Sequence, residues 1–282
     1  MLVPSNSTLL SKQAFLDFTK MVCDNVGLAL DESKEYLLDS RLTPLAKANG
    51  YPDYVSCIQH LNATPIGPLH WQAFEALLTN ETMFFRDEHF FAGLKDMIIP
   101  SLIEKKRALK KLAIWCTSVS TGQEAYSLAI LIKESFPELN TWDVQIYASD
   151  VCKDAITKAK AGSYNTIELK RGLTEAQIQK YFHINSVGNY VIDPNLQKMI
   201  HFFNVNLIAP LDEIKTFDLI LIRNVMIYFL PDTKQAVLKK IYEKLLDDES
   251  FLMLGAAESL IGSRYFTLHR VGKCSFYKKK SL

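Results

Sequence analysis

Several polar residues directly follow short apolar runs, and their types suit a nucleoside ligand. Residues 118–122 are small and end in Gly122, so the backbone there can approach a ligand closely before a helix begins. Asp150 follows the next apolar run, and a carboxylate at that point of an α/β fold can accept hydrogen bonds from both ribose hydroxyls. The same carboxylate could instead cap a helix that begins near Lys153. Both interpretations of Asp150 stay open at this point.

A second set of candidates includes Arg223 and Asn224, which follow the apolar run 217–222. Polar groups behind a buried strand are costly to desolvate without partners, so the pair predicts a ligand or an internal ion pair, and the ion pair is the more frequent outcome. The segment 80–86, with sequence NETMFFR, is a polar and aromatic cluster at an expected domain junction, where ligand sites collect. No G-x-G-x-x-G motif is present, which disfavours a dinucleotide.

The elements that must position these residues alternate between short apolar runs and amphipathic segments. The apolar runs, typical of buried strands, are 112–118, 144–149, 217–222 and 251–255. The amphipathic segments, typical of helices, are 124–133, 153–161 and 232–246. Such alternation predicts an α/β fold in which a parallel sheet is wrapped by helices.

Two regions depart from this alternation. Residues 11–79 carry apolar residues at helical spacing, with stop signals at Gly27, Pro44 and Gly50, and they predict an N-terminal all-helical domain over 1–79. Residues 80–282 then form the α/β domain. Between 163 and 203 the rhythm breaks, and a Gly188-Asn189 turn signal precedes the runs 190–192 and 199–203. We interpret 163–203 as a small antiparallel β insertion.

Composition excludes several classes of function. Lys plus Arg is 32 against 31 for Asp plus Glu, so the net charge of +1 gives no overall field that attracts nucleic acid or an anionic membrane. The five cysteines are scattered, with no C-x-x-C pair and no His at ligand spacing, which argues against a disulfide framework and a metal site. The N-terminus lacks a signal-peptide pattern. We therefore expect a cytoplasmic protein that does not insert into a membrane.

In several of these segments the chain resembles the CheR-type chemotaxis receptor methyltransferases, which are protein-glutamate O-methyltransferases. The resemblance depends on the joint order and spacing of six segments: NETMFFRDEHFF (80–91), WCTSVSTGQEAYSLA (115–129), ASDVCKDAITKAKAGSY (148–164), FNVNL (203–207), FDLILIRNVMIYF (217–229) and GAAESL (255–260). The family more often has Glu-Glu-Pro-Tyr-Ser where this chain has QEAYS, but Glu124 is kept.

This resemblance implies a fold, a cofactor and a set of site residues. The implied fold is a helical N-terminal domain, a Rossmann-like class I methyltransferase sheet and an inserted three-stranded antiparallel subdomain. The cofactor is S-adenosylmethionine, which leaves as S-adenosylhomocysteine, with no metal. The residues implied to contact it are Asn80, Thr82, Arg86, Glu124, Asp150, Asn206, Leu207, Arg223 and Asn224. Among them, Asp150 is implied to bind the ribose and Glu124 the methionyl ammonium.

The implied reaction is methyl transfer to glutamate side chains of a receptor, giving methyl esters. A glutamate carboxylate is already ionised near neutral pH, so alignment rather than a general base is required. Arg86 could orient the incoming carboxylate, and Tyr228 could lie beside the sulfonium. Four nearby phenylalanines, at 84, 85, 90 and 91, have near-helical spacing that favours interdomain core packing over a cofactor box.

Two other functions remain open from the sequence. The same fold could methylate another protein or a small-molecule carboxylate, although a helical domain and an insertion favour a macromolecular partner. A sensor that binds S-adenosylmethionine without turnover is the second alternative, and it would have no use for an acceptor-orienting arginine. We expect a monomer whose partners are the cytoplasmic helical regions of methyl-accepting chemotaxis receptors. A C-terminal tether peptide of the receptor, paired with the insertion, is a further candidate partner.

Overall fold

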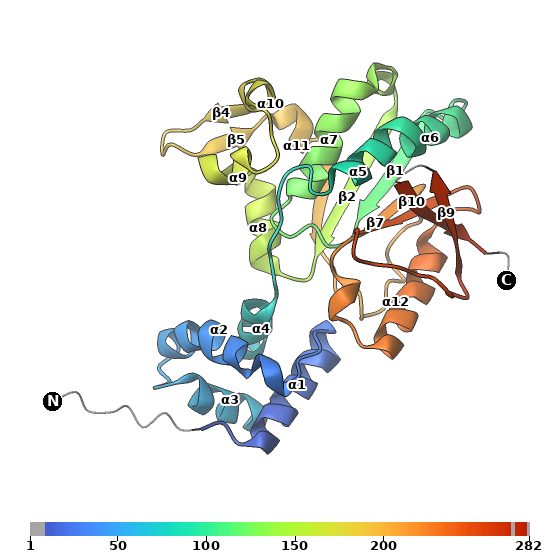
Figure 1. Cartoon of the computed structure of the whole chain (residues 1–282). Coiled ribbons are helices and arrows are strands. Elements are labelled where there is room, and N and C mark those ends of the chain that lie inside the picture. Colours follow the sequence, from blue (N-terminus) through green and yellow to red (C-terminus); the bar gives the residue numbers. More distant parts are fainter. Residues whose placement is uncertain (1–8, 272–273, 281–282) are drawn as a thin grey trace. The chain divides into compact units, whose positions relative to one another are not determined.

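The chain divides into two compact units. This computed structural model describes residues 9–271 and 274–280. One unit comprises Met1–Thr79 with Tyr228–Thr233, and the other comprises Asn80–Ile227 with Lys234–Leu282. Figure 1 follows the chain from blue to red through these units. Within the described ranges, no helix combines the length and apolar character that a membrane crossing requires.

The first unit is helical, as its apolar spacing predicts. Its elements are α1 (Lys12–Val26), a 3-10 turn (Glu32–Lys34), α2 (Glu35–Ala48), α3 (Tyr54–Ala63) and α4 (Pro68–Leu77). Ser11 caps α1 by accepting a hydrogen bond from the Ala14 N–H, and Gly27 ends this helix at φ 77°. The buried side chains Phe18, Leu42 and Phe74 fill the core between these helices.

One stop signal in this unit was misassigned. Pro44 was predicted to end a helix, yet α2 continues through it to Ala48. Proline removes the N–H that would bond to the carbonyl of Ser40. Ser40 is exposed, so water can hydrate that carbonyl and the helix tolerates the missing bond.

The second unit is built on a seven-stranded sheet with the order β6-β2-β1-β7-β8-β10-β9. The first five strands in that order are parallel, and β10 pairs antiparallel with both β8 and β9. The strands are β1 (Lys111–Cys116), β2 (Asp143–Asp150), β6 (Ile200–Asn204), β7 (Leu219–Ile222), β8 (Phe251–Leu254), β9 (Phe266–Val271) and β10 (Cys274–Lys279). The predicted parallel sheet is therefore confirmed.

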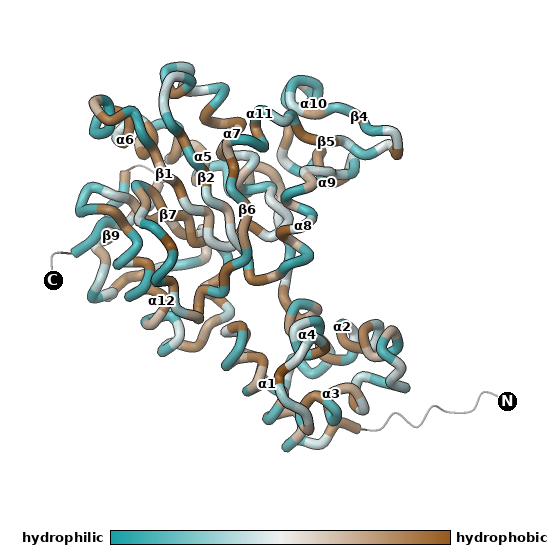
Figure 2. Tube along the Cα trace, turned by 180° about the vertical axis from the view of Figure 1, so that it is seen from behind, coloured by the Kyte–Doolittle hydropathy of each residue, from teal (hydrophilic) through white to brown (hydrophobic). Residues whose placement is uncertain are grey.

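Helices cover both faces of this sheet (Figure 1). They are α5 (Glu88–Gly93), α6 (Ile99–Lys106), α7 (Gln123–Ser135), α8 (Lys153–Ala161) and α12 (Pro231–Lys244), with a π-helical turn (Leu94–Ile98) and 3-10 turns (Pro137–Thr141 and Met226–Tyr228). Side chains of β7 alternate between the faces: Leu219 and Leu221 belong to the core cluster shared with α6 and α7, whereas Ile220 points the other way. Figure 2 shows apolar residues concentrated in the central strands.

The insertion is smaller than predicted. A three-stranded sheet with the order β3-β5-β4 is antiparallel, as expected, and is accompanied by short helices. Its elements are β3 (Ser163–Tyr164), α9 (Thr166–Lys170), α10 (Glu175–Tyr181), β4 (Phe182–Ile184), β5 (Tyr190–Ile192) and α11 (Pro194–Gln197). The run 199–203, assigned to the insertion from sequence, instead forms β6 and pairs in parallel with β2. Most side chains of β6 are half-exposed or exposed, so its sequence did not show the buried pattern that indicates a strand of the main sheet.

Candidate active site

The strand order reverses at β1, because β2 lies on one side of it and β7 on the other. Ligands of open α/β sheets bind at such a switch point, outside the carboxyl ends of the strands. The loop after β1 turns sharply there, with Ser120 at φ 50° and Gly122 at φ 97°. A Cβ on Gly122 would lie 2.9 Å from the Ala159 Cβ and 3.1 Å from the Tyr164 hydroxyl. Both the backbone angle and the available space therefore require glycine.

Asp150 ends β2 at this same edge and is buried. Its Oδ2 accepts a hydrogen bond from the Ser120 N–H at 2.7 Å, and its Oδ1 accepts one from the Cys152 N–H at 3.0 Å. The N-cap of α8 is Cys152, with no side-chain cap, so the interpretation of Asp150 as the N-cap is wrong. The carboxylate instead joins the loop after β1 to the end of β2.

Arg223 follows β7, and its side chain is only 2% exposed. Its guanidinium lies 2.7 Å from the carboxylate of Glu124 and 2.6 Å from that of Asp87. It also stacks over the Phe90 ring, with 3.8 Å between Cζ and the ring centroid. Two carboxylates and an aromatic face offset the desolvation of one buried cation. The internal ion pair predicted for Arg223 is confirmed.

Glu124 stands in the first turn of α7, where the helix dipole favours negative charge. Burial raises the pKa of the Glu124 carboxyl above its usual range, and the Arg223 charge acts in the opposite direction. A buried carboxylate at this position can also receive a second cation, such as a ligand ammonium group, by a charge-assisted hydrogen bond.

The segment 80–86 is connected to the loop after β1. The Ser120 hydroxyl donates to the Asn80 carbonyl at 2.9 Å, and the Asn80 amide lies 3.6 Å from the Cys152 sulfur. Asn80 itself is exposed and Thr82 is half-buried. These contacts place the start of the segment beside the Asp150 carboxylate, because Ser120 and Cys152 both donate to Asp150.

The end of the same segment is connected to Arg223. The Arg86 carbonyl accepts a hydrogen bond from the Arg223 guanidinium at 2.8 Å. The Arg86 guanidinium folds back to donate to the Glu81 carbonyl at 3.1 Å. Phe85, at φ 48°, donates its N–H to the Ser127 Oγ at 2.9 Å. Arg86 is therefore brought together with Arg223 and, through it, with Glu124.

The nearby phenylalanines pack inside the second unit. Phe84 is fully buried, with ring centroids 5.1 Å from Tyr164 and 5.8 Å from Phe182, in edge-on geometry. Phe90 and Phe91 belong to the same core cluster. The prediction that these phenylalanines are core residues is confirmed. They belong to the core of the second unit rather than to an interdomain core, because the residues they pack against come from the insertion and from the helices that cover the main sheet.

Asn206 and Leu207 follow β6, the strand that pairs with β2. The Val205 N–H donates to the Asp150 carbonyl at 3.0 Å. The Asn206 Oδ1 accepts a hydrogen bond from the Ile208 N–H at 3.1 Å, which forms a tight turn, and Leu207 is buried. This pairing brings the two predicted residues to the edge where Asp150 lies.

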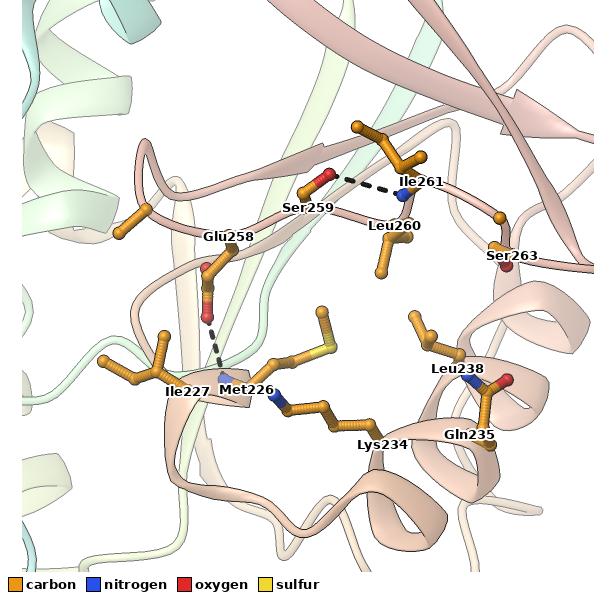
Figure 3. Close-up of a pocket in the computed structure, with 12 residues that line it drawn as sticks. Met226, Ile227, Lys234, Gln235, Leu238, Glu258, Ser259, Leu260, Ile261 and Ser263 are labelled. Carbon is orange, nitrogen blue, oxygen red and sulfur yellow. Dashed lines mark hydrogen bonds between the residues drawn. The ribbon is translucent and has the colours of Figure 1, made fainter.

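The loop after Arg223 is held by a residue that was not predicted. Asn224 has φ 56°, and the Glu258 carboxylate accepts hydrogen bonds from the N–H groups of Asn224 and Met226, both at 2.8 Å. Figure 3 shows Glu258 reaching Met226 at the wall of a pocket of about 340 Å³. Tyr228 is half-buried and ends the 3-10 turn, where the chain passes to the helical unit, and its backbone carbonyl accepts from the Ala29 N–H at 3.0 Å.

Three residues of this site escaped sequence reasoning. Asp87 directly follows the predicted Arg86, and Ser120 lies inside the predicted loop 118–122. Glu258 is the last residue of the sequence Gly-Ala-Ala-Glu, one of the segments that resemble the CheR family. A buried arginine requires acidic partners, so the position of Arg223 behind a buried strand could have pointed to a nearby acidic residue such as Asp87. Of the described residues, no group of His, Cys, Asp and Glu could hold a metal ion.

The donor set suits a nucleoside with a cationic side chain. Carboxylates at Asp150 and Glu124 flank a turn of small residues, and neither a Gly-rich phosphate loop nor a metal cluster accompanies them among the described residues. This strand order and switch-point site fit the class of S-adenosylmethionine-dependent methyltransferases. Residues 80–272 match the family "CheR methyltransferase, SAM binding domain", and residues 13–79 match "CheR methyltransferase, all-alpha domain". The chain belongs to the CheR methyltransferase family, and S-adenosylmethionine is its cofactor.

Curated relatives extend over nearly the whole chain. "Chemotaxis protein methyltransferase Cher2" of Pseudomonas putida is 33% identical over 254 residues, which are 89% of this chain and 90% of the relative. "Chemotaxis protein methyltransferase 1" of Vibrio cholerae is 33% identical over 275 residues, which are 96% of this chain and 98% of the relative.

Solved structures that are similar to this chain are more distant. A TehB-like SAM-dependent methyltransferase from Corynebacterium glutamicum is 14% identical, covers 69% of this chain and 95% of its own, and has a TM-score of 0.37. The glycopeptide N-methyltransferase MtfA, complexed with S-adenosylmethionine, is 10% identical, covers 60% and 55%, and has a TM-score of 0.33. The family assignment rests on the sequence matches.

Proposed function

We propose that this protein transfers the methyl group of S-adenosylmethionine to glutamate side chains of chemotaxis receptors, giving glutamate methyl esters. The match of both parts of the chain, in order, to the CheR family carries this proposal. The relatives are named chemotaxis protein methyltransferases, which supports a protein of the chemotaxis system as the acceptor. The helical unit and the insertion favour a macromolecular acceptor over a small metabolite.

The residues at the switch point are proposed to bind the cofactor. Asp150 accepts hydrogen bonds from the ribose hydroxyls. Glu124 accepts a hydrogen bond from the methionyl ammonium while its carboxylate remains paired with Arg223. The turn at Asn206 and the loop at Asn224 complete the cradle around the adenosine. Further contacts are proposed for Asn80, Thr82, Arg86 and Leu207.

Methyl transfer requires alignment and no general base. When bound, S-adenosylmethionine would supply an electrophilic methyl group to a glutamate oxygen, and S-adenosylhomocysteine would leave with the electron pair of the broken carbon–sulfur bond. Arg86 is proposed to orient the incoming carboxylate by a charge-assisted hydrogen bond, and Tyr228 to lie beside the sulfonium. Strong anions against that sulfur would stabilise the ground state, so a tyrosine is the better neighbour.

We propose that the chain is divided into two domains, residues 1–79 and residues 80–282. The antiparallel sheet of the insertion has two edge strands, β3 and β4, and either edge could add a strand from a receptor tether peptide. Exposed Ile184 on β4 would give such a peptide an apolar contact. We propose that the protein acts as a monomer.

The proposal is tested with the purified chain, radiolabelled S-adenosylmethionine and membranes that contain chemotaxis receptors. We expect label on a receptor-sized band, and mild base should release it because methyl esters hydrolyse. Label that resists base, or that appears only on small molecules, would point to another acceptor. Tight binding of S-adenosylhomocysteine, measured by calorimetry, with no label transferred would instead support a sensor.

A further inference from the structure

The Glu258 carboxylate accepts four backbone hydrogen bonds. Its Oε2 accepts from the N–H groups of Asn224 at 2.8 Å and Gly255 at 3.0 Å. Its Oε1 accepts from the N–H groups of Val225 at 3.1 Å and Met226 at 2.8 Å. Four donors from two separate loops therefore converge on one side chain, which Figure 3 shows pointing toward Met226.

The loop after β7 needs such an anion. Asn224 has a left-handed backbone, at φ 56°, which turns three successive N–H groups toward one point. Convergent N–H groups of this kind form an anion-binding concavity, and without an anion their partial positive charges repel one another. Glu258 supplies this anion from within the chain, because its ionised carboxylate offers about four acceptor positions.

The spacing between the two loops is fixed by a glycine. A Cβ on Gly255 would lie 2.9 Å from the Glu258 Oε2 and 3.1 Å from the Asn224 N. The end of β8 therefore approaches the loop after β7 more closely than a side chain would allow. The same loop is held on its other side by Arg223, which pairs with Asp87 and Glu124.

We propose that Glu258 is a positioning residue for methyl transfer. Its carboxylate fixes the conformation of residues 224–226 and so holds Asn224 where it meets the cofactor. This inference rests on the proposed function, because it takes the role of Asn224 from there. In this role Glu258 touches neither cofactor nor acceptor and acts through the backbone of the loop.

The test replaces the carboxylate with its amide, Glu258→Gln, which keeps the size of the side chain but turns an NH2 group toward some of the donors. Glu258→Asp keeps the charge and withdraws it by one methylene. Glu243→Gln, on the exposed face of α12, is the matched control for the loss of one negative charge. Amide hydrogen exchange, affinity for S-adenosylhomocysteine and the kinetics of methyl transfer are measured for all four proteins.

We expect the amides of Val225 and Met226 to exchange about tenfold faster or more in Glu258→Gln, because hydrogen bonds to a charged acceptor are lost. The value of kcat/KM should fall by about 10²-fold, as expected when reacting groups are misplaced by about 1 Å. Glu258→Asp should lie between the wild type and Glu258→Gln, and Glu243→Gln should match the wild type in all measurements.

Unchanged exchange at these amides, or unchanged kcat/KM in a folded Glu258→Gln protein, would overturn the inference. If Glu258→Gln does not fold, a wild-type kcat/KM in Glu258→Asp would overturn it equally. Failure of the proposed function is a separate result, because it would appear as a wild-type protein that neither binds S-adenosylhomocysteine nor transfers methyl groups.

Discussion

At the scale of single residues, the site is organised by charges that are buried together with their partners. Arg223 is almost fully buried, and it is tolerated because Glu124, Asp87 and the Phe90 ring surround it. One guanidinium thereby joins the end of β7, the start of α7 and the segment that carries Arg86. Substitutions in the site are therefore expected to separate into those that affect binding and those that affect transfer.

Arg86→Ala is expected to reduce the rate of transfer more than the affinity for the cofactor. The Arg86 carbonyl, which accepts from Arg223, is kept in this variant, so the site should remain assembled. Removal of the guanidinium takes away the proposed contact with the incoming carboxylate. We expect kcat to fall at least about tenfold, since a charge-assisted hydrogen bond contributes roughly 1.5–3 kcal/mol. The Kd for S-adenosylhomocysteine, measured by calorimetry, should rise by a clearly smaller factor. A wild-type kcat would remove Arg86 from the mechanism.

Asp150→Asn is expected to have the opposite profile. The amide keeps the shape of the side chain but loses the charge that the ribose hydroxyls would meet. A hydrogen bond to a charged group contributes roughly 1.5–3 kcal/mol, so its loss should raise the Kd for S-adenosylhomocysteine about 10- to 100-fold. Isothermal titration provides the measurement, and an unchanged Kd would show that Asp150 does not bind the ribose and acts through contacts within the chain, such as those with the Ser120 and Cys152 N–H groups.

At the scale of elements, close backbone approaches hold the insertion against the site segment. Gly172, which follows α9, has φ 113°, and a Cβ there would lie 1.9 Å from the Phe84 carbonyl oxygen. Gly188, in the turn before β5, has φ 82° and would meet no atom within 4 Å. The two glycines thus share a left-handed backbone but differ in the space around them.

Gly172→Ala should therefore destabilise the protein much more than Gly188→Ala. Left-handed backbone costs an alanine roughly 1–2 kcal/mol at either position, and steric overlap adds about 1–3 kcal/mol at Gly172. Urea unfolding of the two variants measures the difference in the free energy of unfolding. Equal losses in both variants would mean that Phe84 moves away from Gly172 without cost.

Glu249 joins two elements at the surface, and its contribution should depend on pH. It pairs with Lys105 of α6 and, at 3.0 Å, with Lys278 of β10, and these lysines lower the pKa of its carboxyl from 4.5 to about 2. Because the folded pKa is the lower one, the stabilisation is present above pH 4.5 and is lost as the pH falls toward 2. Its side chain is 60% exposed, so solvent screening limits the effect to less than about 1 kcal/mol.

Glu249→Gln should accordingly lower the free energy of unfolding slightly at pH 7, and the difference from the wild type should vanish near pH 2. Denaturant titrations at several pH values provide the measurement. Glu243→Gln, which removes the same charge from the exposed face of α12, should show no such trend. A difference that grows as the pH falls would contradict the lowered pKa of Glu249.

Most of the central sheet could be predicted, because β1, β2, β7 and β8 are apolar runs with nearly continuous burial. The antiparallel pair of β9 and β10 was missed, because exposed polar residues such as His269 and Arg270 interrupt its apolar pattern. In the site, residues next to predicted strands were found readily. Asp87 and Glu258 were not, because their roles depend on partners 136 and 32 to 34 residues away in sequence.

At the scale of the whole molecule, binding and folding of the second unit should be coupled. A ligand that binds only the folded state stabilises it, and at about a hundred times its Kd the gain is about 2.7 kcal/mol. We expect S-adenosylhomocysteine to raise the melting temperature in a concentration-dependent way. Calorimetric scans of the wild type and of Asp150→Asn check this, and an identical shift in both at the same ligand concentration would contradict the role of Asp150.

The helical unit is assembled from two stretches of the chain, Met1–Thr79 and Tyr228–Thr233. A gene cut at codon 80 would therefore separate six residues from the fold to which they belong, although the family boundaries also fall there. An engineer who exchanges helical regions between relatives, in order to redirect the enzyme to another receptor, would need to transplant both stretches as one cassette.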